Sequence, residues 1–125
     1  MINRVLIVDD SAMARTIIRR SVEICGLQDV TVLEAGNGAE AFALLKSEPV
    51  DLIFSDLNMP DMDGEELLKR IKSSPKLFDI PVIIITSKKS TAGERRLIDE
   101  HALAVLSKPL SLPELNQVLE ENFEI

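Results

Sequence analysis

The feature that most constrains how this chain can fold is the regular alternation of short apolar runs with segments of helical periodicity. Apolar runs predict five strands, at residues 5–8, 30–35, 52–54, 82–85 and 104–106. Four of these runs are almost continuously apolar and often β-branched, which is typical of strands covered on both faces. A helical segment follows each strand, and crossovers between parallel strands are right-handed. The pattern therefore predicts a doubly wound (βα)5 protein of the α/β class, with helices on both faces of a parallel five-stranded sheet.

Capping signals and apolar stripes predict where the five helices lie. Asn37 with Glu40, and Ser111 with Glu114, have the spacing of capping pairs and open the second and fifth helices. Gly26 is predicted to end the first helix. The residues that mark the helices are Ala14, Ile17, Ile18, Val22 and Cys25 on one stripe of the first, Ala41, Leu44 and Leu45 facing inward on the second, Gly64, Leu67, Leu68 and Ile71 in the third, Leu97, Ile98 and Ala102 in a less regular fourth, and Leu112, Leu115 and Leu119 facing inward on the fifth.

Composition and charge narrow the classes of function. The 125 residues include 14 basic and 21 acidic side chains, and the formal net charge of −7 argues against a nucleic-acid backbone as partner. Tryptophan and tyrosine are absent, which largely excludes base-stacking platforms for single-stranded nucleic acid. We find no linker, low-complexity stretch or repeat, so we expect one domain over residues 1–125.

The single cysteine and the hydropathy of the chain indicate the cellular compartment of the protein. Cys25 is the only cysteine, which excludes an internal disulfide and favours a reducing compartment. No segment approaches the ~18 to 20 apolar residues that span a bilayer. The apolar run near the amino terminus is too short for the core of a signal peptide. We therefore expect a cytoplasmic protein that does not insert into membranes.

Polar side chains follow four of the predicted strands. Asp9-Asp10 follows the first strand, Ser55-Asp56 the third, Thr86-Ser87 the fourth and Ser107-Lys108-Pro109 the fifth. In open α/β sheets, ligands bind beyond the carboxyl ends of the strands, where the strand order reverses. We therefore expect three carboxylates, a hydroxyl and an ammonium to converge at one edge of the sheet.

This set of groups indicates metal-assisted phosphoryl chemistry. Three neighbouring carboxylates repel one another unless a cation is bound, and a hard, oxygen-preferring ion such as Mg²⁺ is the natural guest. An aspartate held beside such an ion and a lysine can act as a nucleophile towards a phosphoryl group. The ion and the ammonium then stabilise charge on the transferring oxygens, and the threonine hydroxyl donates a hydrogen bond.

Taken together and in this order, the motifs closely resemble the receiver domain of two-component response regulators, specifically the single-domain, CheY-like chemotaxis type. The resemblance covers the whole chain and rests on Val8-Asp9-Asp10-Ser11, Asp56-Leu57-Asn58-Met59-Pro60 with Asp63-Gly64, Thr86-Ser87 and Lys108-Pro109. It implies a flavodoxin-like fold with the strand order 2-1-3-4-5.

The resemblance also implies a function. The chain would be a stand-alone, monomeric response regulator that accepts a phosphoryl group from a sensor histidine kinase and is not an enzyme acting on metabolites. A conformational switch would then signal to a downstream protein target, for example the flagellar motor or another chemotaxis protein. Asp56 would accept the phosphoryl group. Asp10, Asp56 and the backbone carbonyl of Asn58 would ligate Mg²⁺ directly, and Asp9 would act through water.

The remaining implied roles concern the switch. Thr86 would contact the phosphoryl group and act as the switch, Lys108 would pair with the acyl phosphate, and the bond between Lys108 and Pro109 would be cis. The sequence departs from the family pattern at two positions. Val105 stands three residues before the lysine, where an aromatic residue coupled to the threonine is usual. Lys88 stands two residues after Thr86, where many members carry an acidic or small residue and where phosphate lifetime is affected.

Two alternatives remain beside this interpretation. A phosphatase of the haloacid dehalogenase type also uses a nucleophilic aspartate and Mg²⁺ on an α/β sheet, but the position of its second aspartate is Asn58 here, which cannot act as a carboxylic acid. The chain could also be the receiver part of a larger DNA-binding or kinase protein.

Three further features of the sequence are interpreted as structural and not functional. The segment 61–64 superficially resembles a calcium loop, but with Gly64 at the sixth position the first and twelfth positions would be Met59 and Arg70, so we interpret it as a turn into the third helix. Cys25 is expected to be a buried packing residue. His101, the only histidine, is expected on a helix surface without a catalytic or zinc role.

Overall fold

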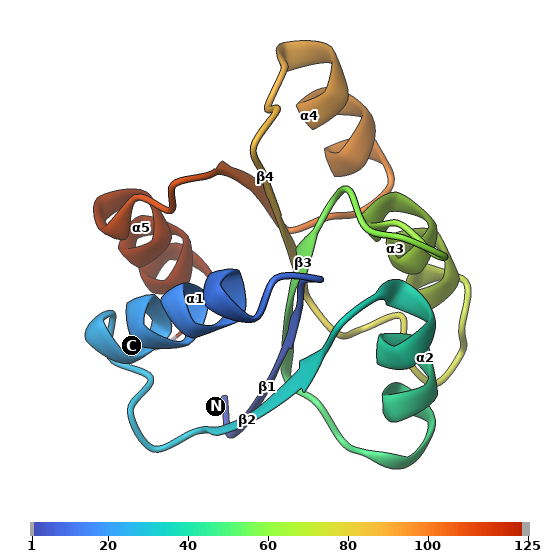
Figure 1. Ribbon diagram of the computed structural model, residues 1–125, viewed down its shortest axis with the longest axis horizontal. Coiled ribbons are helices and arrows are strands. Elements are labelled where there is room, and N and C mark those ends of the chain that lie inside the picture. The colour runs from blue at the N-terminus through green and yellow to red at the C-terminus, as the bar shows by residue number, and fades with distance from the viewer. Residues whose placement is uncertain (1, 124–125) are drawn as a thin grey trace.

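A computed structural model describes residues 2–123 as a central sheet between two layers of helices (Figure 1). All neighbouring strands are parallel and their order is β2-β1-β3-β4-β5, which confirms the predicted flavodoxin-like α/β fold. The elements are β1 Arg4–Val8, α1 Ala12–Ile24, β2 Thr31–Ala35, α2 Gly38–Ser47, β3 Leu52–Asp56, α3 Gly64–Lys72, β4 Val82–Thr86, α4 Thr91–Asp99, β5 Ala104–Ser107 and α5 Leu112–Asn122.

The sheet separates two aliphatic cores. Alternate side chains of each strand point to opposite faces, so that Leu6 packs into one core and its neighbour Ile7 into the other. Helices α2, α3 and α4 cover the first face, and α1 and α5 cover the second. Every residue of β3 and β4 is buried, which explains why their sequences are almost continuously apolar. The burial of both strands fixes where their carboxyl ends lie in the fold.

Each helix begins at a side chain that accepts a hydrogen bond from a free backbone N–H of the first turn. The five capping residues are Ser11, Asn37, Asp63, Ser90 and Ser111. The predicted caps of α2 and α5 are therefore confirmed, and so is the turn at 61–64, which leads into α3. Gly26 has a φ of 109°, the left-handed conformation that ends a helix.

The predicted buried faces of α1 and α5 were wrong at one residue each. Ile17 is 51% exposed, because the buried face of α1 is a narrow strip through Ile18 and Val22. Leu112 is 38% exposed, because it begins α5, whereas the buried residues of this helix, Leu115 and Leu119, lie further along it. Helix periodicity shows which residues share a face, but the position of the neighbouring elements decides how much of that face is covered.

The region after α4 also differs from the prediction. The helix ends at Asp99, so Ala102 lies outside it, although its side chain is buried. His101 stands in the turn after the helix with a φ of 75°, in place of the expected helix surface. It is exposed, and the turn brings the chain back into β5.

Candidate functional site

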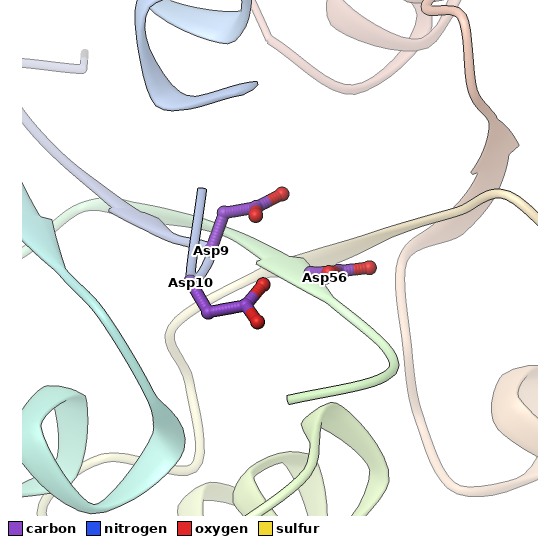
Figure 2. A group of neighbouring side chains, drawn as sticks. All are labelled: Asp9, Asp10 and Asp56. Atoms are coloured by element: carbon purple, nitrogen blue, oxygen red, sulfur yellow. The ribbon is translucent and has the colours of Figure 1, made fainter. Parts of the chain in front are cut away.

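Three carboxylates gather where β1 and β3 end (Figure 2). Asp9 and Asp10 follow β1, and Asp56 is the last residue of β3, the strand that pairs with β1. Oxygen atoms of the three carboxylates lie within 4.8 Å of one another. Since consecutive strands β2 and β3 lie on opposite sides of β1, this is the point where the strand order reverses and where such sheets bind ligands.

The three carboxylates differ in burial and in what holds them. Asp9 is fully buried, and its two oxygens accept hydrogen bonds from the backbone N–H of Ser11 at 2.9 Å and from Nζ of Lys108 at 2.8 Å. Asp56 is 7% exposed, and its Oδ1 accepts from the N–H of Leu57 at 2.8 Å. Within residues 2–123, the exposed Asp10 carboxylate accepts no hydrogen bond. It is the carboxylate most available to a cation.

Lys108 brings the only ammonium that pairs with these carboxylates within the described chain. Besides its bond to Asp9, its Nζ lies 3.4 Å from Oδ2 of Asp56. Its backbone N–H donates to the carbonyl of Thr86 at 2.8 Å, which joins the ends of β4 and β5, and the following bond to Pro109 is cis, as predicted.

The electrostatics of the site show that its negative charge is only partly balanced. Burial, and then the charge of Asp9, raise the pKa of Asp56 above its usual value, while Lys108 and the N–H of Leu57 act in the opposite direction. Burial lowers the pKa of Lys108, but its bonds to Asp9 and Asp56 outweigh that effect, so its pKa is raised. The ammonium stays charged, and the ionised form of Asp56 is less favoured than that of a free aspartate, so a further cation would stabilise it.

Gly64 allows α3 to begin directly beneath Asp56. Its N–H donates to the carbonyl of Leu57 at 2.9 Å. A Cβ at this position would lie 2.1 Å from the backbone oxygen of Asp56, closer than any real contact, so only glycine fits. Asp63-Gly64 is one of the motifs that carry the family resemblance, and this close approach is the physical reason for a glycine there. Asn58 lies exposed in the same short loop, two residues after Asp56.

Thr86 and Val105 lie on β4 and β5, outside the carboxylate cluster. Thr86 is buried at the end of β4, and its Oγ1 accepts a hydrogen bond from the backbone N–H of Lys88 at 3.1 Å. Val105 is buried on β5, opposite Ile84, and packs into the core that also contains Leu97 of α4. The side chain of Lys88 is exposed.

The fold and the site together define a class: a doubly wound α/β protein with an acidic, lysine-paired site at the carboxyl edge of its sheet. Residues 5–120 match the response regulator receiver domain family. The chain belongs to this family.

Individual relatives agree with this assignment. A chemotaxis protein CheY homologue of Campylobacter jejuni is 37% identical over 97% of this chain and 89% of its own length. A gliding motility regulatory protein of Myxococcus xanthus is 42% identical over 84% of this chain, which corresponds to 13% of that longer protein. The structure of the chemotaxis response regulator CheY4 of Vibrio cholerae superposes with a TM-score of 0.82 at 27% identity, over 97% of this chain and 98% of that one.

None of the helices in residues 2–123 is both long enough and apolar enough to cross a bilayer.

Proposed function

We propose that this protein is a phospho-acceptor switch that takes up a phosphoryl group on Asp56 in a Mg²⁺-dependent reaction. The observation that carries the proposal is the surroundings of the Asp56 carboxylate. It is nearly buried, crowded by two other carboxylates and 3.4 Å from the ammonium of Lys108. A carboxylate with this combination of neighbours is suited to nucleophilic chemistry at an electron-poor phosphorus atom.

The donor set fits a magnesium ion. Three carboxylates with oxygens within 4.8 Å of one another and a single paired ammonium leave excess negative charge, and oxygen is the ligand type that Mg²⁺ prefers. Asp10 and Asp56 are the expected direct ligands, together with the carbonyl of Asn58. Asp9 is already engaged by Ser11 and Lys108, which suits a contact through water. When bound, the ion supplies positive charge to the oxygens of the transferring phosphoryl group.

The side chains of the chain itself account for the remaining steps. A carboxylate oxygen of Asp56 attacks phosphorus, the bond between phosphorus and the donor breaks, and the product is an acyl phosphate. Lys108 lies where its Nζ can pair with the new charge, since it already lies 3.4 Å from Oδ2 of Asp56. The hydroxyl of Thr86 is the hydrogen-bond donor expected to contact a phosphoryl oxygen.

The proposal includes the partners and the location expected from the sequence. A sensor histidine kinase would be the donor and a chemotaxis protein the downstream target, which the CheY homologue of C. jejuni supports by its name. The M. xanthus protein leaves open the alternative that such a chain serves within a larger regulator. We propose a monomer in the cytoplasm, and the free thiol of Cys25 agrees with a reducing compartment.

Exposure to acetyl phosphate tests the proposal. In the presence of Mg²⁺ the intact protein should gain the mass of one phosphoryl group, and an excess of chelator should prevent the gain. An equal gain of phosphoryl mass with and without chelator would contradict the metal dependence. Steady turnover of a simple phosphomonoester would instead favour the phosphatase alternative, which we expect to fail because Asn58 replaces the acid.

Substitution of Asp10 by Asn is expected to change stability in opposite directions with and without metal. In chelator, the loss of one repelling charge should raise the free energy of unfolding by up to about 1 kcal/mol, the scale of interactions between partly exposed charges. With Mg²⁺ at a hundredfold excess over Kd, wild type should gain about 2.7 kcal/mol and the variant almost none. Urea unfolding followed by circular dichroism measures both effects.

Asp29→Asn is the matched control for this comparison, because Asp29 lies in the loop before β2, at the opposite edge of the sheet. It should leave the magnesium effect intact. A lower stability of Asp10→Asn than of wild type in chelator would contradict the idea that the carboxylates repel one another.

A further inference from the structure

The position of the Asp10 carboxylate depends on the backbone that carries it. This side chain accepts no hydrogen bond from the described residues, so no hydrogen-bond donor orients the Asp10 carboxylate towards Asp9 and Asp56. The backbone N–H of Asp9 makes the last bond to β2, to the carbonyl of Ala35 at 3.1 Å. Beyond this bond the chain leaves the sheet, and the peptide between Asp9 and Asp10 needs another partner to stay in one orientation.

Arg15 supplies that partner. From the first turns of α1, its Nη1 donates to the backbone carbonyl of Asp9 at 2.6 Å, and its Nε donates to Oε1 of Glu34 at 2.7 Å. The guanidinium therefore joins the end of β1 to the side chain of a residue on β2. Its N–H groups have a fixed planar geometry, so the bond to Glu34 also determines how the guanidinium meets the carbonyl.

Glu34 is itself held from two sides. It lies on β2 opposite Ile7 of β1, and its second oxygen, Oε2, accepts from Nη2 of Arg19 at 3.0 Å. Arg19 is one helical turn beyond Arg15 and has no bond to Asp9. Only one of these two arginines reaches the peptide beside the carboxylate cluster, although both carry the same charge and share the same partner.

We propose that Arg15 is a positioning residue for the metal site. By holding the carbonyl of Asp9, it fixes the plane of the peptide between Asp9 and Asp10, and so keeps the Asp10 carboxylate within reach of a cation shared with Asp56. The inference rests on the proposed function for the identity of the cation, Mg²⁺, and extends it to a residue that contacts neither the ion nor the phosphoryl group.

Charge and position predict opposite effects of Arg15 on Mg²⁺ affinity. A nearby positive charge repels a cation, so an arginine that acted only by its charge would weaken Mg²⁺ binding, and its removal would strengthen it. An arginine that orients a ligand strengthens binding. Loss of residues that orient metal ligands weakens affinity by about tenfold or more.

A magnesium titration followed by the NMR shifts of backbone amides distinguishes the two roles. Arg15→Lys keeps the charge but not the pair of hydrogen bonds to Asp9 and Glu34, and Arg15→Gln removes both the charge and the bonds. We expect each to raise the Kd for Mg²⁺ about tenfold.

Arg19→Gln is the matched control, because it removes the same charge from the same partner, and its Kd should equal that of wild type. Glu34→Asp keeps the negative charge but shortens the side chain that holds Nε of Arg15, so it should raise the Kd by a smaller factor, and it serves as the second test if an Arg15 variant fails to fold.

The outcomes separate this inference from the proposed function. If wild type shows no saturable Mg²⁺ binding, the proposed metal site is wrong and the role of Arg15 is wrong with it. If wild type binds Mg²⁺ and the Arg15 variants bind it equally or more tightly, the positioning role alone is overturned. A weakening confined to Arg15 and Glu34 variants, with unchanged amide shifts in α3 and β4 before metal is added, supports it.

Discussion

Replacement of Asp56 by Asn is expected to abolish uptake of a phosphoryl group from acetyl phosphate. The amide of asparagine has nearly the same shape as the carboxylate but no anionic oxygen, so the variant can occupy the same space without acting as a nucleophile. Intact-mass measurement in the presence of Mg²⁺ should show the added phosphoryl group on wild type and no detectable gain on the variant.

Asp63→Asn is the matched control for this experiment. Asp63 caps α3 by accepting from the N–H of Glu66, and asparagine is an equally good cap, so this variant should be phosphorylated like wild type. Asp56→Asn should also be at least as stable as wild type in chelator, because burial and the charge of Asp9 disfavour an ionised group there. An equal mass gain in Asp56→Asn and wild type would mean that another residue accepts the phosphoryl group.

The fold could be predicted from the sequence because two signals agree along the whole chain. The apolar runs that became β3 and β4 are buried on both faces, and the caps Asn37 and Ser111 begin helices where their spacing indicated. The proximity of Asp9, Asp10 and Asp56 followed from the same prediction, because parallel strands place their carboxyl ends at one edge. Local pattern and overall topology support each other here.

The features that could not be predicted depend on contacts without a sequence pattern. Arg15 acts on a backbone carbonyl, which every residue possesses, and its second partner, Glu34, is separated from it by 19 positions. The exposure of Ile17 depends on how far the neighbouring layer extends over α1. His101 adopts a positive φ in the turn after α4, and no glycine at this position indicates such a turn in the sequence.

Thr86 is the residue from which we expect a signal to leave the site. In the structure its Oγ1 accepts from the N–H of Lys88 and so is tied to the loop that leads to Ser90, the cap of α4. A phosphoryl group on Asp56 would offer the hydroxyl a charged acceptor, and charge-assisted hydrogen bonds are the stronger kind. Such a contact exists only in the phosphorylated state, which is what a two-state switch requires.

We expect helix α4 to move in response to this change. Leu97 is its only buried residue, and the contact between Arg96 and Glu65 of α3, with distances of 2.9 and 3.1 Å, lies on the surface, where ion pairs contribute little. Val105 packs in the same core as Leu97, but its short β-branched side chain has one χ angle and few rotamers. It can fill little of the space that Thr86 would vacate.

We therefore expect Thr86→Ala to abolish the response of α4 and Val105→Ala to preserve it. The response is the change in amide hydrogen exchange or NMR shifts over residues 87–99 when beryllofluoride, a mimic of the phosphoryl group, is added with Mg²⁺. Thr86→Ser keeps the hydroxyl and should respond like wild type. Val105→Ala should lower the free energy of unfolding through the cavity it leaves, yet still transmit the change. Loss of the response in Val105→Ala together with its survival in Thr86→Ala would show that the signal runs through β5 instead, because the side chain of Val105 would then be required and the hydroxyl of Thr86 would not.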